Sequence, residues 1–382
     1  MSMDLQDIFL QLVRLGIGCE AGAALSVSGP LSVEDWQALE NLANEQGLLG
    51  VMLDGVEKLP REWRPEKRAI IKSIGQLVQS EQQYAVQEHA ATEMALLLHQ
   101  HGIRTYVLKG AVVAECYPRP EHRRSVDMDC FLLPEEGLED VWERGNQVLE
   151  EHGFEVRRDF YKNSTVMLPG LTVENHRYLT PFRGNSRLKL LERWLQSMIA
   201  GRSSTASTGS ATGSLSAPKG DESSRFEGTW LYRPPVMVSA LFLIEHAYSH
   251  FLHEGLTWRL VLDWQMFCRR HRDEIDWQEF QARVDEFGFR RFYDSFNRIG
   301  EYLVGELPAD GLQPMDLQML PDIWSPLDLH DSVTGWRGKL ALAGNTWRAR
   351  WKYRLFTDLT WLRALWIQVK GVVIGKFREE SL

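Results

Sequence analysis

Two aspartates, Asp127 and Asp129, lie two positions apart in the segment SVDMDCFLL, residues 125–133, which alternates with a period of two around them. This alternation predicts a strand, and side chains two positions apart on a strand point to the same face. The two carboxylates can therefore share one cation. Burying both without a counter-charge would be costly, and Mg²⁺ prefers carboxylate and phosphate oxygens as ligands. Solvated aspartates at a strand end or in a turn would show the same triplet, so the surrounding sequence must distinguish these alternatives.

A glycine turn precedes the two aspartates. Residues 103–108 are β-branched and aromatic and predict a strand, and an apolar helical run begins directly after Lys109-Gly110. Glycine at such a turn allows backbone amides and a helix N-terminus to approach a triphosphate closely. Lys109, together with Arg123 and Arg124 just before the acidic strand, can neutralise phosphate charge. We therefore expect a phosphate-binding turn beside the acidic strand.

A third carboxylate, Glu174, lies in the second half of a predicted β-hairpin. The hairpin sequence, STVML-PG-LTVENHRYL, turns at Pro169-Gly170. On a strand near Asp127 and Asp129, Glu174 would complete a metal site and activate an attacking hydroxyl group. The sequence thus predicts a metal site of three carboxylates on a small sheet.

Periodicity divides the whole chain into four parts. Residues 1–100 show helical spacing of apolar residues and predict an N-terminal helical module, whereas residues 101–200 show strand and helix signals and predict an α/β core. Residues 201–226 are rich in Gly and Ser and predict a flexible linker, and helical spacing resumes over residues 227–382. The predicted fold class is α+β, with a small mixed sheet flanked by an N-terminal and a C-terminal helical module.

The composition is that of an ordinary globular chain and argues against several classes of protein. Hydrophobic residues make up 44% of the 382 residues, and the formal net charge of -9 argues against a protein that coats nucleic acid. Asp4 and Asp7 stand where a secretory signal carries basic residues, and the four cysteines show no metal-binding spacing. No apolar stretch is long enough to span a bilayer. These features predict a cytoplasmic protein without a transmembrane segment.

Histidines and an arginine in the helical part after residue 227 also carry potential chemistry. His246, His250 and His253 share one face of a predicted helix, where they are either core or groove histidines or metal ligands. Arg259 and Asp263 are spaced for an ion pair within one helix. A position facing a nucleotide remains an alternative, above all for His246 and His250.

The C-terminal segment from residue 346 interleaves Lys and Arg with tryptophan. Such a segment either completes the core with its tryptophans while its cations stay hydrated, or makes a peripheral contact with a membrane or a polyanion such as RNA. The first interpretation is favoured, because tryptophans at helical spacing are more often part of a core.

The acidic strand and its turn resemble those of a known superfamily. Leu-Lys-Gly at 108–110, a short helix ending at Tyr117, and Asp-Met-Asp at 127–129 together resemble the DNA polymerase β-like nucleotidyltransferase superfamily. More narrowly, the chain is similar to an uncharacterised bacterial nucleotidyltransferase family whose glycine turn reads Leu-Lys-Gly. The third strand of that family often ends in a Glu-x-His element, which Glu-Asn-His at 174–176 matches. The resemblance covers roughly residues 35–280.

This resemblance implies a metal-dependent enzyme that transfers a nucleoside monophosphate from a nucleoside triphosphate (NTP) to an acceptor. The implied metal is Mg²⁺, with Mn²⁺ as an alternative. Asp127 and Asp129 would hold it against the β and γ phosphates, and Glu174 would share a second metal with the acceptor oxygen. The residues that the resemblance and the neighbouring charges place at the nucleotide are Lys109, Gly110, Arg123, Arg124 and His176.

Two residues depart from the family pattern. Ala111 follows Gly110 where the superfamily usually has Gly or Ser, so a hydroxyl contact to phosphate is missing. Asn175 replaces a hydrophobic residue beside Glu174. These departures keep open a second interpretation, a catalytically degenerate nucleotide-binding or scaffold protein linked to polysaccharide biosynthesis. The sequence does not identify the acceptor of the transferred group, which is a small molecule, a protein or RNA.

Overall fold

The computed structural model describes most of the chain. The described residues are 5–19, 31–135, 140–158, 161–182, 185–201, 224–253, 255–325, 347, 349–358 and 360–362. Most of the predicted linker over residues 201–226 and most of the basic segment from residue 346 lie outside them. The linker, the role of that basic segment and the boundaries of the four parts therefore stay predictions.

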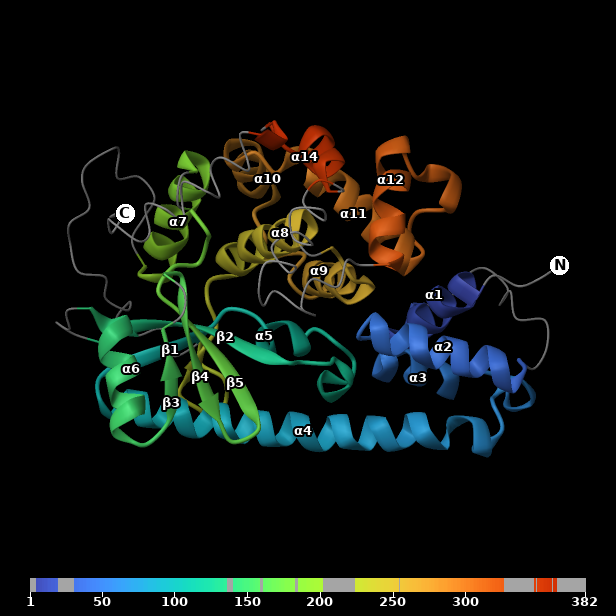
Figure 1. Cartoon of the computed structure of the whole chain (residues 1–382), viewed down its shortest axis with the longest axis horizontal. Coiled ribbons are helices and arrows are strands. Elements are labelled where there is room, and N and C mark those ends of the chain that lie inside the picture. The colour runs from blue at the N-terminus through green and yellow to red at the C-terminus, as the bar shows by residue number, and fades with distance from the viewer. Residues whose placement is uncertain are drawn as a thin grey trace.

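Six strands form one mixed sheet (Figure 1). Its order is β3-β4-β5-β2-β1-β6, and β2 pairs parallel with β5 and antiparallel with β1. The predicted α+β fold, with a small mixed sheet and helices before and after it, is confirmed. The strands are β1 (Ile103–Val107), β2 (Asp127–Pro134), β3 (Glu155–Arg157), β4 (Asn163–Leu168), β5 (Leu171–His176) and β6 (Leu231–Tyr232).

The predicted hairpin is formed by β4 and β5. These strands pair antiparallel and turn at Pro169 and Gly170. Gly170 has a φ of 74°, a left-handed conformation that glycine adopts without steric cost. Beyond the hairpin, β5 lies beside β2, and their parallel register pairs Asp129 with Glu174. The hairpin thus delivers the third carboxylate to the acidic strand.

Helices account for most of the remaining described chain. Before the sheet lie α1 (Leu5–Gly16), α2 (Val33–Glu45), α3 (Leu49–Glu57) and α4 (Lys67–Gln100), and between strands lie α5 (Ala111–Ala114), α6 (Val141–Glu151) and α7 (Ser186–Ile199). After β6 follow α8 (Val236–His253), α9 (Trp258–Arg270), α10 (Trp277–Phe287), α11 (Arg290–Val304), α12 (Pro314–Trp324) and α14 (Arg350–Phe356). Short 3₁₀ segments are η1 (Arg61–Trp63), η2 (Pro120–His122) and η4 (Ala309–Gly311). Among the described helices, none combines the length and the hydropathy that a membrane crossing requires.

Helix α4 connects the N-terminal helices to the sheet. Its 34 residues span about 50 Å at about 1.5 Å per residue. Near its C-terminal end it buries Ala91, Met94, Ala95 and Leu98, which recur at helical spacing, and it contacts β1, β5 and β6. It also contacts α2 and α3, and Figure 1 shows it running below both the sheet and these helices.

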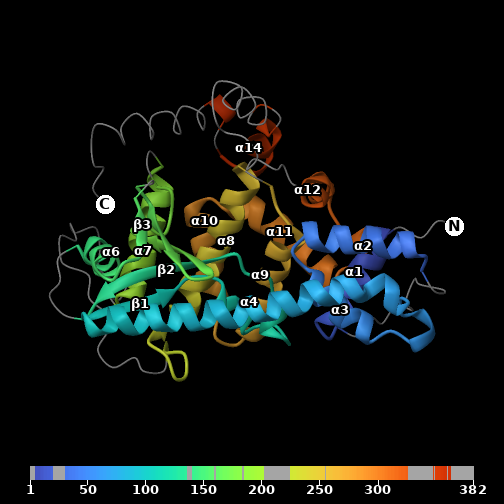
Figure 2. The same cartoon turned by 60° about the horizontal axis from the view of Figure 1, so that its bottom comes forward.

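Helices cover both faces of the sheet. On one face, Leu132 of β2 packs closely against Gly145 of α6, where an added Cβ would overlap the leucine side chain. On the other face, the ring of His176 meets the ring of Phe242 of α8 edge-on, with 6.3 Å between centroids. Figure 2 shows α4 along one side of the strands and α8 on the other. Since Asp129 and Leu132 differ by an odd number of positions, the acidic residues face α8.

Candidate functional site

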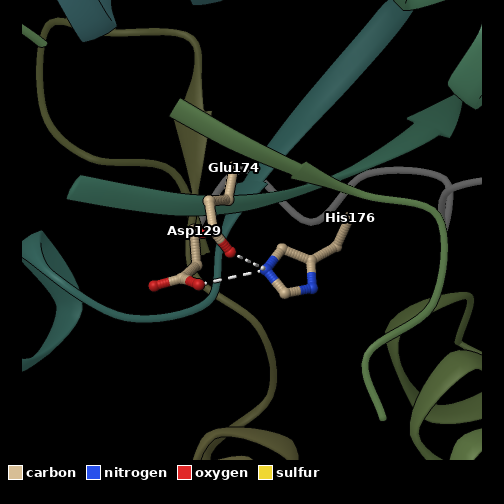
Figure 3. Close-up of side chains that lie close together, drawn as sticks. All are labelled: Asp129, Glu174 and His176. Atoms are coloured by element: carbon tan, nitrogen blue, oxygen red, sulfur yellow. Dashed lines mark hydrogen bonds and ion pairs between the residues drawn. The ribbon is translucent and has the colours of Figure 1, made fainter. Parts of the chain in front are cut away.

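Three side chains converge on the face of the sheet that α8 covers (Figure 3). Asp129 and Glu174 are register partners on β2 and β5, so their side chains point the same way, and His176 follows two positions later. Nε2 of His176 lies 3.0 Å from Oδ1 of Asp129 and 3.6 Å from Oε2 of Glu174. One ligand atom from each residue lies within 4.8 Å of the others, so the three side chains could hold a metal ion.

His176 is hydrogen-bonded to Asp129 and makes a longer ion-pair contact with Glu174. Its other ring nitrogen, Nδ1, lies 3.1 Å from the carbonyl oxygen of Tyr178. Burial and the charge of Lys162 oppose protonation, but the hydrogen bonds to Asp129 and Glu174 raise the pKa of His176. The same contact lowers the pKa of Glu174. The imidazole therefore fixes the orientation of both acids.

Asp127 lies at the outer end of this cluster. It precedes Asp129 by two positions on β2 and is half-buried, whereas Asp129 is only 3% exposed. Burial raises the pKa of Asp127, and the negative charges of Asp129 and Glu174 raise it further against the effect of Lys109. The predicted metal set of Asp127, Asp129 and Glu174 thus shares one region of the sheet. The role of Asp127 as a ligand stays a prediction.

Lys109 enters the site from the end of β1. Its Nζ lies 2.9 Å from Oδ2 of Asp129 and 3.0 Å from Nε2 of His246 on α8. Burial alone would raise the pKa of Asp129, but Lys109 and the hydrogen bond from His176 hold it well below its ordinary value. The contact with Lys109 is an ion pair without hydrogen-bond alignment, so the buried Oδ2 of Asp129 keeps an unused lone pair.

Gly110 forms the turn between Lys109 and helix α5. Its φ of 74° and ψ of -104° are strained for any residue with a Cβ atom. A Cβ placed there would lie 3.6 Å from Oγ of Ser125 and 3.7 Å from the carbonyl oxygen of Asp127. The turn and the start of the acidic strand are therefore neighbours in space, as the sequence predicts.

Arg123 and Arg124 differ in their environments. Arg123 is 2% exposed, and its Nε and Nη2 donate to the two carboxylate oxygens of Asp263 at 2.8 and 2.7 Å. Tyr117 also donates to Asp263, at 2.8 Å. Arg124 is exposed and donates to the carbonyl oxygen of Asn44 at 3.4 Å. The contacts of Arg123 therefore do not support its predicted role at the phosphates, and Asp263 pairs with Arg123 instead of forming the predicted intrahelical pair with Arg259.

One of the three histidines on α8 reaches the site. His246 accepts a hydrogen bond from Lys109, and burial together with that ammonium charge lowers its pKa well below the ordinary value. Its ring contacts that of His250, with 4.4 Å between centroids. His253 is exposed and bonds through Nδ1 to the carbonyl oxygen of Ser249 at 2.8 Å. His246 is therefore a groove histidine that holds Lys109.

Sequence reasoning missed two contacts of the site. Asn163 of β4 donates to Oε2 of Glu174 at 2.7 Å, and Lys109 bonds to His246 across 137 positions of sequence. The register of the hairpin could have indicated Asn163, because it pairs with His176. No local pattern indicates the pairing of Lys109 with His246.

The departure at Asn175 has a structural explanation. Asn175 pairs with Cys130 on β2, one position away from Glu174, and so points to the opposite face of the sheet. There its Nδ2 donates to Oδ1 of Asn146 on α6 at 2.9 Å, and Ser164 donates to the same oxygen at 2.7 Å. The polar residue at position 175 therefore belongs to a buried hydrogen-bond network on the opposite face and leaves Glu174 in the site.

The loop that leads to the acidic strand is anchored by a histidine between two carboxylates. His122 is buried, with Nδ1 2.9 Å from both oxygens of Asp54 and Nε2 2.9 Å from Oε1 of Glu81. Burial lowers the pKa of His122, but the hydrogen bonds to Asp54 and Glu81 outweigh burial and raise it. The imidazole, whose protonated form these two carboxylates favour, thus fastens η2 to α3 and α4.

This anchor predicts a pH-dependent stability. A histidine whose pKa is raised on folding contributes stability fully below about pH 6.5, its unfolded pKa, and loses that contribution as pH rises through the folded value. We expect His122→Gln to remove part of the stability measured by urea unfolding at pH 6 and to flatten its fall towards pH 8.5. His89→Gln, an exposed substitution on α4, is the matched control. An unchanged pH profile in His122→Gln would show that His122 is neutral in the folded protein.

Comparison with known proteins gives one match. A family model described as an uncharacterised nucleotidyltransferase matches residues 32–303, which is most of the chain. The match includes the glycine turn, the acidic strand, the hairpin, and helices α8 and α9. No significant match was found among curated proteins or among solved structures. The resemblance inferred from the sequence motifs is confirmed.

Proposed function

The chain belongs to the uncharacterised nucleotidyltransferase family, and from this premise we propose that it transfers a nucleoside monophosphate from an NTP to a hydroxyl-bearing acceptor. The acceptor oxygen forms a bond to the α phosphorus, the bond from that phosphorus to the α–β bridging oxygen breaks, and pyrophosphate leaves. The observation that carries the proposal is the convergence of Asp129, Glu174 and His176 beside Lys109 and the Gly110 turn.

The residues present fit a divalent cation. The buried Oδ2 of Asp129 lacks a hydrogen bond, and the carboxylates of Asp127 and Glu174 lie in the same region of the sheet. Oxygen donors of this kind suit Mg²⁺, and a histidine nitrogen beside them also suits Mn²⁺. We propose that Asp127, Asp129 and Glu174 hold the metal. When bound, the metal would neutralise phosphate charge and lower the pKa of the acceptor hydroxyl.

The protein's own side chains have separate tasks in this proposal. Lys109 carries the positive charge closest to Asp129, and His246 keeps its ammonium group in place, where it would offset the negative charge of the acids and of a bound triphosphate. His176 orients Asp129 through a 3.0 Å contact. The side chain of Glu174 is 37% exposed, so it is accessible to an acceptor hydroxyl and can receive its proton. Catalysis of this kind consists mainly of positioning and electrostatic stabilisation.

Nucleotide binding tests the proposal directly. We expect at least one of ATP, GTP, CTP and UTP, with Mg²⁺, to raise the melting temperature by a few degrees. A ligand at 100 times its dissociation constant stabilises the folded state by about 2.7 kcal/mol. Replacing Mg²⁺ by a chelator should abolish the shift, because the acids would then repel the phosphates. The absence of a shift with all four NTPs and either Mg²⁺ or Mn²⁺ would contradict the proposal.

A further inference from the structure

Arg259 is a cation near the acidic strand without a carboxylate partner among the described residues. It lies in the first turn of α9 and is partly buried. Its Nη1 donates to the carbonyl oxygen of Arg124 at 2.8 Å, and in the described part of the chain its Nε and Nη2 have no acceptor. A partly desolvated guanidinium with spare donors is suited to bind an anion.

Contacts of the two residues after α2 with the start of α9 fix the position of Arg259. Gln46, at the end of α2, accepts a hydrogen bond from the backbone N–H of Trp258 at 2.8 Å and donates to the carbonyl oxygen of Ile323 at 3.0 Å. The stem of Arg259 lies against Gly47, where a Cβ would approach its Cδ to 3.2 Å. The start of α9 is therefore anchored by Gln46, and the stem of Arg259 is directed by its contact with Gly47.

Asp127 experiences the charges of both Arg259 and Lys109. Each of these cations lowers the pKa of Asp127 against the effect of burial. In turn, burial and the neighbouring charge of Arg123 lower the pKa of Arg259, whereas Asp263, Tyr117 and, least of the three, Asp127 raise it. The hydrogen bond of Arg259 to the carbonyl oxygen of Arg124, three positions before Asp127, places Arg259 at the start of the acidic strand from the side of α9, whereas Lys109 approaches from the end of β1.

The other buried cations of this region are already engaged. Lys109 is held by Asp129 and His246, and Arg123 is held by both oxygens of Asp263. We propose that Arg259 binds the phosphate chain of the nucleotide, in the role that the sequence suggested for Arg123. This inference rests on the proposed function and adds to it a phosphate ligand from a helix outside the sheet.

Binding of tripolyphosphate tests this assignment without knowledge of the preferred base. We expect calorimetric titration with Mg²⁺ and tripolyphosphate to show about 10- to 100-fold weaker binding in Arg259→Gln, since a charge-assisted hydrogen-bonded contact is lost. Glutamine keeps an N–H donor for the carbonyl oxygen of Arg124, so a purely structural role would be retained. Arg270→Gln, an exposed substitution at the end of the same helix, should bind like the wild type.

The outcomes separate this inference from the proposed function. If the wild type binds neither tripolyphosphate nor any NTP, the proposed function and the assignment of Arg259 are both overturned. If the wild type binds and Arg259→Gln, with unchanged melting temperature, binds equally well, only the assignment of Arg259 is overturned. Should Arg259→Gln fail to fold, Arg259→Lys decides, because it keeps the charge but loses the bidentate geometry. We expect weaker binding in that variant, and an unchanged affinity would overturn the assignment.

Discussion

Asp127→Asn and Asp129→Asn are each expected to abolish the NTP-dependent thermal shift and to reduce nucleotidyl transfer by about 10³-fold or more. Both substitutions keep the shape of the side chain but remove a negative charge from the region where the metal and phosphates would meet. In such a site, loss of one electrostatic contact typically costs about 10² to 10³ in rate, and loss of a metal ligand removes the cation's contribution as well. Transfer is measured as pyrophosphate released in a cell extract that supplies acceptors.

The two variants control for each other. Asp129 is buried and paired with Lys109 and His176, so its substitution also disturbs the fold, whereas Asp127 is half-buried at the outer end of β2. A folded Asp127→Asn variant therefore separates loss of chemistry from loss of structure. Asp310→Asn, at an exposed position in η4, should behave like the wild type. Wild-type transfer in a folded Asp127→Asn variant would contradict the assignment of Asp127.

Asp263→Asn is expected to lower the free energy of unfolding by about 3–5 kcal/mol, because it leaves the buried guanidinium of Arg123 without a counter-charge. Both side chains of this pair are 2% exposed. Asparagine retains an acceptor for the hydroxyl of Tyr117, so the loss reports mainly on the ion pair. Equilibrium unfolding in urea measures the difference.

A double substitution identifies the cause of that loss. Replacing both partners, in Arg123→Leu with Asp263→Leu, removes the buried charges together and should recover part of the stability lost in Asp263→Asn. Asp310→Asn, an exposed substitution, should change stability by less than about 0.5 kcal/mol. A loss below about 1 kcal/mol in Asp263→Asn would show that solvent or another anion reaches Arg123.

Local patterns in the sequence were sufficient to predict the strands that carry the acids. The period of two around Asp127 and Asp129 predicts that they share a face, and Pro169-Gly170 predicts the hairpin that brings Glu174 alongside. Both signals depend on the geometry of neighbouring residues along the chain, which a single sequence contains.

Pairings between distant segments could not be predicted in the same way. The ion pair of Arg123 with Asp263 joins residues 140 positions apart, and it displaced the local pairing that the spacing of Arg259 and Asp263 suggested. The contact of Lys109 with His246 spans 137 positions. The first depends on α9 packing beside the glycine turn and the second on α8 covering the acidic face of the sheet, and helical periodicity indicates a buried face without naming its partner.

The central claim is that the protein transfers the α phosphate of an NTP, with its nucleoside, to an acceptor. Following the α and γ phosphates separately tests this claim most directly. Parallel incubations of the wild type, with Mg²⁺ and an NTP labelled at either the α or the γ phosphate, are carried out in a cell extract that supplies acceptors. Our account predicts that the α label becomes attached to an acceptor while the γ label leaves as pyrophosphate, and that neither occurs with Asp127→Asn. Transfer of the γ label to an acceptor, or binding of NTP with no release of pyrophosphate, would contradict it.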